Sequence, residues 1–471
     1  MKKNLFLLVV LAFCVQAGMA CTNFIVGKKA SADGSVFISY SADSYGMSGF
    51  VAHFPAGVHA AGTMRDVYEW DSGRFLGTIP EAPVTYNVLG NINEHQVAIA
   101  ETTFGGRPEL VDTTGIIDYG SLIYIALQRS KTAREAIEVM TSLVAEYGYY
   151  SSGESFSIAD PNEAWILEMV GKGGMEKGAV WVAIRIPDDC ISAHANQSRI
   201  RKFDMRDKEN VLYSRDVVSF ARKMGYYSGR DADFDFAAAY CPADFGGLRW
   251  CDARAWSFFN MFADADMSQY LAWASGDVTA EPMPLYFKPK APLTLQDVQR
   301  GMRDHYEGTP FDITNDLGAG PYSMPYRPSP LSFEVDGKEY FNERPISTFQ
   351  TAFTFVAQLR DYLPNAIGGV MWFGTDDANM VVYTPVYCSA TAVPDCYAER
   401  YADPLVFSWN SSFWVFNWVS NMIYPKYSLV IDDMREVQST LENSIYERSR
   451  AVEAEAAAVY ASSPRYAQQM L

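Results

Sequence analysis

Short apolar runs separated by polar turns fill much of the first half of the chain. Residues 24–26 and 36–40 are two such runs, and the polar Ala-Asp-Gly turn between them predicts a β-hairpin. Residues 97–100 form a further run after a polar turn and predict another strand. The same reasoning predicts three later strands, at 155–159, 164–170 and 179–186.

Between these two groups of strands, the spacing of the apolar residues changes to that of a helix. Over residues 119–129, Ile123, Ala126 and Leu127 fall on one helical face. A second helix is expected to begin after Thr132, because Glu135 stands three residues later in the spacing of a capping box. Gly148 is expected to end that helix.

Strands, then a helix pair, then strands do not give the strict alternation of a parallel sheet. The order indicates an α+β protein with two stacked, largely antiparallel sheets and helices outside them. Residues 200–345 mix helical stretches with Pro/Gly-rich loops, 346–362 are predicted to be helical, and 366–386 a strand pair. A long Ala- and Glu-rich pattern at 428–461 predicts a solvated outer helix. No internal repeat interrupts the chain, so 21–471 is expected to form a single domain.

Composition narrows the class of protein. The chain has 471 residues, of which 49% are hydrophobic and 20% charged, and this is typical of globular proteins rather than disordered or collagenous ones. The 56 acidic residues outnumber the 38 basic ones, so the formal net charge is −18. Such a chain is repelled by phosphate backbones and anionic lipid, which argues against nucleic acid or a membrane surface as partner.

The first twenty residues resemble a signal peptide. Lys2 and Lys3 precede an apolar stretch at 5–15, and Gly18-Met19-Ala20 is a small-x-small cleavage site. The apolar stretch is too short to anchor the chain across a bilayer. We therefore expect an exported protein, periplasmic or secreted, with residues 1–20 removed.

Cleavage at that site makes Cys21 the first residue of the mature chain, and three interpretations compete. Cys21 could carry a lipid, although Gly18 and Met19 match a lipoprotein signal poorly. It could be a structural or disulfide cysteine at a chain terminus. Alternatively, it is a catalytic nucleophile whose own freed α-amine serves as base, because that amine titrates near ~7.7–8.0 and accepts a proton near neutrality.

The residues around Cys21 resemble a known family. The opening Cys-Thr-Asn-Phe-Ile-Val-Gly-Lys-Lys-Ala-Ser-Ala-Asp-Gly-Ser is similar to that of the cysteine-type N-terminal-nucleophile (Ntn) hydrolases of the dipeptidase A and secernin family. This family is related to penicillin V acylases and bile salt hydrolases. Further landmarks follow in order over most of residues 21–430: Gly90-Asn91-Ile92-Asn93-Glu94, Ala100-Glu101-Thr102-Thr103, Asp118-Tyr119-Gly120-Ser121-Leu122, Asp160-Pro161-Asn162-Glu163-Ala164-Trp165 and Ala195-Asn196-Gln197.

The resemblance implies a four-layer αββα sandwich with a helical C-terminal elaboration, and it implies roles for individual residues. Asp43 matches the carboxylate that orients the nucleophilic cysteine and its amine, and Asn196 matches an oxyanion-binding amide. Thr103 falls at a second oxyanion-hole position, and Arg254 matches an active-site arginine. Tyr40 stands where many relatives carry an arginine.

The expected function is that of an exported dipeptidase acting on small peptides, with no cofactor. An N-acyl amidase, acting on penicillin V or conjugated bile acids, is the alternative among enzymes. A non-catalytic, lipid-anchored surface binding protein is the alternative from another class. The five histidines lack metal-ligand spacing, so no metal is expected. Oligomeric state is left open, as is disulfide pairing, for which the short-loop combinations are Cys241–Cys251 and Cys388–Cys396, leaving Cys190 free.

Overall fold

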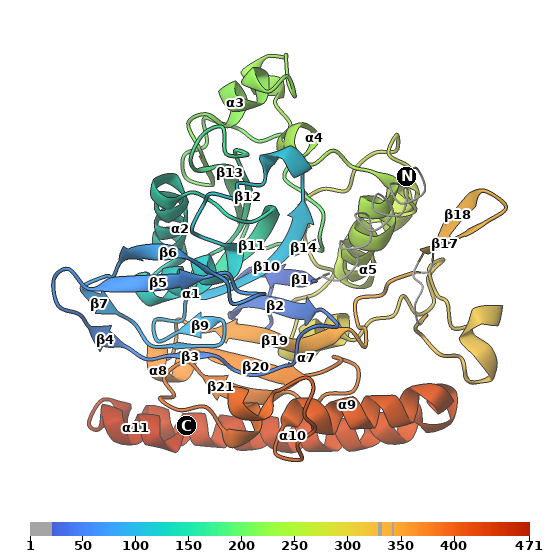
Figure 1. Ribbon diagram of the computed structural model, residues 1–471. Helices are drawn as coiled ribbons and strands as arrows, with labels where there is room; N and C mark the ends of the chain where they lie inside the picture. The colour runs from blue at the N-terminus through green and yellow to red at the C-terminus, as the bar shows by residue number, and fades with distance from the viewer. Residues whose placement is uncertain (1–20, 328–331, 342) are drawn as a thin grey trace, which may run out of the picture.

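Two antiparallel β-sheets face each other at the centre of the molecule (Figure 1). The computed structural model describes residues 21–327, 332–341 and 343–471, so the signal segment expected at 1–20 lies outside the described residues. The seven-stranded sheet runs in the order β16 (Tyr286–Phe287), β14 (Ile191–His194), β1 (Asn23–Val26), β2 (Val36–Asp43), β19 (Thr351–Leu359), β20 (Val370–Thr375) and β21 (Thr384–Tyr387). The eight-stranded sheet runs in the order β15 (Val211–Tyr213), β13 (Ala179–Ile186), β12 (Ala164–Gly171), β11 (Gly153–Ala159), β10 (Ala98–Gly105), β9 (Ile92–Asn93), β8 (Val88–Leu89) and β3 (His53–Phe54).

The predicted hairpin is confirmed, since β1 and β2 pair in antiparallel register with Ile25 opposite Ile38. All eight residues of β2 are buried, because one face lies against β10 and β11 of the other sheet and the opposite face is covered by α7. The meander of three strands predicted over 155–186 is confirmed as β11, β12 and β13.

Two helices cover the outer face of the eight-stranded sheet. They are α1 (Tyr119–Arg129) and α2 (Ala133–Tyr147), as predicted. Thr132 caps α2 by accepting from the backbone N–H of Glu135, and Gly148 ends the helix with a positive φ of 82°. The reciprocal half of the expected capping box differs, because the Glu135 carboxylate accepts from the N–H of Lys131 rather than from that of Thr132.

Helices also cover the outer face of the seven-stranded sheet. Figure 1 shows α10 (Tyr427–Tyr460) running along the base of the molecule below β20 and β21, with α5 (Ala253–Phe262) and α7 (Leu295–Met302) against the same sheet. The predicted C-terminal helix is thus confirmed, but it is more than a solvated cover. Its Glu442 pairs with Arg303, and its Glu453 makes two 2.8 Å hydrogen bonds to Arg360.

Residues 346–362 are not helical, and this prediction is wrong. Thr351–Leu359 forms β19, which pairs with β2 on one side and β20 on the other. Both faces of β19 are buried, so its apolar residues do not alternate with polar ones. Ala352, Phe355, Val356 and Leu359 then happen to repeat at helical spacing.

The remaining elements surround this framework. The strand pair predicted at 366–386 is confirmed as β20 and β21. Three small two-stranded sheets join β4 (Gly57–Val58) to β7 (Val84–Thr85), β5 (Met64–Tyr68) to β6 (Phe75–Pro80) and β17 (Ser332–Val335) to β18 (Lys338–Phe341). The shorter helices are α3 (Val217–Lys223), α4 (Phe236–Tyr240), α6 (Leu271–Ala274), α8 (Asn365–Gly368), α9 (Ser412–Ile423) and α11 (Pro464–Met470).

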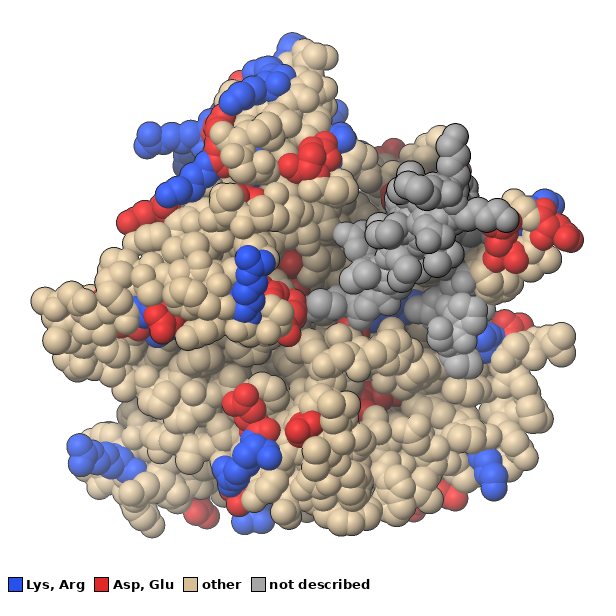
Figure 2. Space-filling model, viewed as in Figure 1, with Lys and Arg blue, Asp and Glu red and all other residues tan. Residues whose placement is uncertain are grey.

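The cysteines and the surface add two observations. The six cysteines of the described residues are all free thiols, so neither short-loop disulfide is formed. No helix among the described residues is long and apolar enough to cross a bilayer. Figure 2 shows acidic and basic side chains interspersed over one face of the molecule, so the excess of negative charge is not gathered into one patch on that side.

Candidate active site

Cys21 lies immediately before β1, where the ends of four strands meet. Because β1 is antiparallel to β14 and to β2, Asn23 lies opposite His194, the last residue of β14, and Thr22 bridges to Ser41 near the end of β2. The end of β10 in the facing sheet closes the same corner. The Cys21 residue is 2% exposed. Side chains from both sheets therefore converge on one buried thiol.

Asn196 and Arg254 hold the main chain of Cys21. The backbone nitrogen of Cys21 donates to Asn196 Oδ1 at 2.7 Å, and Arg254 Nη1 donates to the carbonyl of Cys21 at 2.6 Å. Arg254 Nη2 also donates to Asn196 Oδ1 at 3.0 Å. Asn196 follows β14 with φ at 59°, in the left-handed region that asparagine tolerates better than most residues. A tight turn after the strand thus aims its amide at Cys21.

Arg254 is completely buried within α5. Its other contacts are the Thr22 hydroxyl at 2.7 Å and the carbonyls of Trp250 and Ala195. Burial lowers the pKa of the guanidinium, and the positive charge of nearby Arg344 lowers it further. Arginine stays charged in proteins even so, and the surrounding acceptors satisfy its donors. Its position suits it to fix the start of β1 rather than to move a proton.

Asp43, at the end of β2, lines the same pocket as Cys21. Its carboxylate accepts from Arg344, from the Thr351 hydroxyl at 2.6 Å and from the Ser41 hydroxyl at 3.1 Å. The Asp43 charge raises the pKa of the Cys21 thiol, whereas its backbone amide lowers it. Arg344 is a site residue that the sequence analysis did not identify, and no motif surrounds it.

Thr103 meets Asn196 rather than Cys21. Asn196 Nδ2 donates to the Thr103 carbonyl at 2.8 Å, and the Thr103 hydroxyl donates to Glu154 at 2.7 Å. The five residues suggested by the resemblance are therefore brought together. Four of them form one hydrogen-bonded network, while Asp43 lies across the pocket with its own partners.

Two buried glutamates complete the site, and sequence reasoning did not single them out. Glu101 Oε1 lies 3.6 Å from Cys21 Sγ and accepts from the Tyr40 hydroxyl. Burial raises the pKa of Glu101, and burial together with the Glu101 charge raises the pKa of Glu154 well above its usual range. Glu101 stands within the landmark Ala100-Glu101-Thr102-Thr103, but no role was inferred for it, and Glu154 belongs to none of the landmarks.

The Cys21 thiol is held in its protonated form. Burial is the largest cause that raises its pKa well above the usual value, and the charges of Glu101 and Asp43 act in the same direction. The hydrogen bond between the thiol and the Tyr40 hydroxyl oxygen opposes them in part. A nucleophilic role therefore needs a base close to Cys21 that accepts the proton during reaction.

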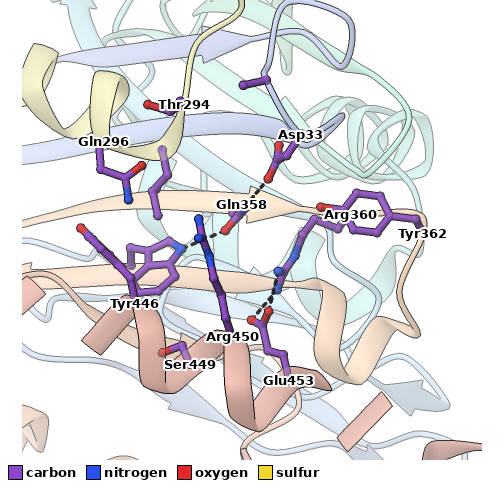
Figure 3. Close-up of a pocket in the computed structure, with 13 residues that line it drawn as sticks. Asp33, Thr294, Gln296, Gln358, Arg360, Tyr362, Tyr446, Ser449, Arg450 and Glu453 are labelled. Atoms are coloured by element: carbon purple, nitrogen blue, oxygen red, sulfur yellow. Dashed lines mark hydrogen bonds and ion pairs between the residues drawn. The ribbon is translucent and has the colours of Figure 1, made fainter. Parts of the chain in front are cut away.

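Another hollow lies between α10 and the seven-stranded sheet (Figure 3). There the Gln358 amide links Asp33 to the indole of Trp372, and Arg360 faces Glu453 across the sheet and helix. These polar groups satisfy one another and include no cysteine. The contacts that line this hollow hold α10 against the sheet. They offer no nucleophile or base like those around Cys21. Within the described ranges, no group of three or more His, Cys, Asp or Glu side chains could hold a metal ion.

Comparisons with known proteins place the chain in a family. A probable dipeptidase of Salmonella dublin is 28% identical over 396 residues, which cover 78% of this chain and 81% of that protein. A probable dipeptidase of Latilactobacillus sakei is 24% identical, covering 93% of this chain and 89% of the relative. A dipeptidase of Bifidobacterium longum is 26% identical, covering 79% and 73%. The sequence model of peptidase family C69 matches residues 20–440, and the chain therefore belongs to peptidase family C69.

Proposed function

We propose that this protein is an exported cysteine-type dipeptidase that hydrolyses small peptides through an acyl-enzyme on Cys21. The observation that carries the proposal is the 2.7 Å hydrogen bond from the backbone nitrogen of Cys21 to Asn196. Removal of residues 1–20 turns that nitrogen into a free α-amine, already positioned beside its own thiol. Membership of family C69 and similarity to proteins named dipeptidases support the same activity.

In the first half of the reaction, Cys21 Sγ attacks the carbonyl carbon of the peptide bond. The α-amine takes the thiol proton as the sulfur–carbon bond forms. The same proton then passes to the departing nitrogen as the carbon–nitrogen bond breaks. The products of this half are a thioester on Cys21 and a free amino acid.

Asn196 supplies a donor for the negative oxygen of the tetrahedral intermediate. Its amide nitrogen carries two hydrogens, of which one is directed to the Thr103 carbonyl. The second is available for the oxyanion, and a neutral amide stabilises that charge without protonating the leaving group. The Thr103 backbone is the second candidate at this position, and Asp43 acts on the cysteine through its charge.

In the second half of the reaction, water hydrolyses the thioester on Cys21. The α-amine accepts a proton from water as the hydroxide attacks the thioester, and the proton returns to sulfur as the carbon–sulfur bond breaks.

The two facing sheets with helices outside them support assigning the chain to the four-layer αββα architecture of the Ntn hydrolases.

The test incubates mature protein and its Cys21→Ala variant with a panel of dipeptides and with penicillin V. Hydrolysis of dipeptides by the mature protein, and none by the variant, is the expected result. Cleavage of penicillin V in preference to all dipeptides would favour the amidase alternative. A lipid-modified, amide-blocked Cys21 in the intact mass of native protein would favour the lipid-anchored binding protein.

A further inference from the structure

A carboxylate beside the nucleophile is not used by the mechanism described above. Glu101 lies on β10, is 1% exposed, and lines the pocket that contains Cys21. Its Oε1 faces the Cys21 sulfur and the Tyr40 hydroxyl. Its Oε2 is buried and accepts from no N–H or hydroxyl group among the described residues. None of these contacts is a cation, so a buried acid is left without a counter-charge at the reacting atom.

A neighbouring carboxyl group, that of Glu154, allows Glu101 to stay buried and negatively charged. Glu154 Oε2 is buried as well, and the two carboxyl groups are hydrogen-bond partners across β10 and β11. The pair avoids two adjacent buried charges by keeping one proton. Burial and the Glu101 charge raise the pKa of Glu154 well above its usual range, which favours Glu154 as the holder of that proton. One negative charge therefore faces the pocket.

The distance from Cys21 suits one particular group of a peptide substrate. In a dipeptide the α-nitrogen lies two bonds from the carbonyl carbon that is attacked, at about 2.5 Å. The attacking sulfur approaches that carbon to about 3–3.5 Å. A carboxylate oxygen 3.6 Å from the sulfur is therefore within ion-pair reach of the α-ammonium. An acyl chain without an amine presents only carbon at this point.

The rest of the pocket agrees with a small cationic group entering beside an apolar side chain. Trp70, Ile123 and Phe353 line it with apolar surface. The charge of Asp71 acts with that of Glu101 on Tyr119, which lines the same pocket, so a second carboxylate lies near this end of the pocket. A low-dielectric site of one sign attracts the opposite charge strongly.

We propose that Glu101 binds the α-ammonium of the substrate and thereby restricts the enzyme to peptides with a free amino group next to the scissile bond. This inference rests on the proposed function and deepens it. It predicts that N-acylated and desamino substrates are poor because they leave the Glu101 carboxylate buried and unpaired.

The experiment compares L-alanyl-L-alanine with propionyl-L-alanine, which lacks only the amino group. We measure kcat and KM for the mature wild-type enzyme, for Glu101→Gln and for Glu138→Gln, an exposed change of the same charge on α2. The wild type and Glu138→Gln should prefer the dipeptide on the order of 100-fold or more in kcat/KM. Glu101→Gln should lose most of this preference, because kcat/KM should fall far more for the dipeptide, through a higher KM, than for propionyl-L-alanine.

Two outcomes would overturn the inference while leaving peptidase activity intact. One is equal hydrolysis of both substrates by the wild type, a result that needs no variant. The other is an equal loss on both substrates in a folded Glu101→Gln enzyme, which would make Glu101 a positioning group for the thiol instead. If the wild type cleaves neither substrate nor any other dipeptide, the proposed function fails and this inference falls with it.

Discussion

The side-chain oxygen of Asn196 lies 2.7 Å from the backbone nitrogen of Cys21, although 175 positions separate the two residues in the sequence. The same oxygen accepts from Arg254, so the nitrogen of Cys21 is held from one direction by a fixed acceptor. This contact fixes one N–H bond of the freed amine, so that its lone pair remains available to the sulfur of its own side chain.

The role of the Asn196 amide can be isolated with Asn196→Asp. Aspartate tolerates the positive φ and keeps the oxygen that accepts from Cys21 and Arg254, but it lacks the N–H donor. We expect kcat to fall by roughly 100-fold, as for removal of one oxyanion donor. Steady-state kinetics beside Asn410→Asp, the same change at an exposed position, checks this. Near wild-type kcat in Asn196→Asp would contradict the role.

A free α-amine on Cys21 is required if that amine is the base. A form that retains even one residue before Cys21 carries an amide there, which accepts no proton near neutral pH. We expect this form to be folded and inactive, and trimming to Cys21 should restore activity. In the trimmed enzyme the rate should fall as the pH drops below neutrality, because the amine becomes protonated. A blocked form as fast as the trimmed one would rule the amine out.

Metal removal should leave hydrolysis unchanged, because no metal-binding group of side chains was found among the described residues. We expect EDTA to have no effect on dipeptide hydrolysis and a thiol alkylator to abolish it. Mass analysis should place the alkyl group on Cys21. Loss of activity with EDTA and survival of alkylation would instead identify a metallopeptidase.

His194 should make stability depend on pH. Its two ring nitrogens contact the hydroxyls of Thr102 and Ser157 at 2.7 Å each, and burial lowers its pKa to about 3. The unfolded chain binds this proton near pH ~6.5, whereas the folded protein does not bind it until about pH 3. The stabilisation is thus complete above about pH 6.5 and is lost as the pH falls, by about 1.4 kcal/mol per unit.

Denaturant unfolding of wild type and His194→Gln at several pH values tests that sign. Other buried carboxyls titrate in the same range, so the quantity to follow is the difference between the two proteins in free energy of unfolding. This difference should shrink from pH 7 towards pH 4. A difference that stays constant over that range would show that His194 is not buried in its neutral form.

The docking of α10 depends on a buried ion pair. Arg360 and Glu453 have side chains only 8% and 11% exposed, and Figure 3 shows them meeting between sheet and helix. Glu453→Ala leaves a buried guanidinium unpaired and should reduce the free energy of unfolding by roughly 3 kcal/mol. Glu447→Ala, on the exposed side of the same helix, should change it by less than about 0.5 kcal/mol. Equal effects would mean that the Arg360–Glu453 pair contributes no net stability to the docking of α10.

Local signals in the sequence predicted the first half of the fold well. The hairpin of β1 and β2, the helix pair and the meander from β11 to β13 each carry their own period, turn or cap. The strand β19 was misread, because burial on both faces removes the alternation that identifies a strand. Burial of that kind is a property of the assembled sandwich and is not written into nine residues of sequence.

The site residues also fall into two groups, those that the sequence predicted and those that it did not. Cys21 could be inferred from its place after a cleavage site, and Asn196 and Arg254 from resemblance. Glu101 and Arg344 could not, because a carboxylate or guanidinium gains its meaning from partners that the fold brings from distant segments. Arg344 donates a hydrogen bond to Asp43 although 301 positions separate them, and no local sequence pattern predicts such a pair.

The pairing of β2 with β19 has a consequence for how the chain folds during its synthesis. The Thr351 hydroxyl meets Asp43 across 308 positions of sequence, so the strand that carries half of the site waits for its neighbour until most of the chain has been synthesised. Contacts at such separations form slowly, since a long loop must close before they contribute. Until then β2 presents an open edge, and the nascent chain has no assembled pocket around its sulfur. Fragments lacking β19 should therefore be both catalytically inert and prone to edge-to-edge association.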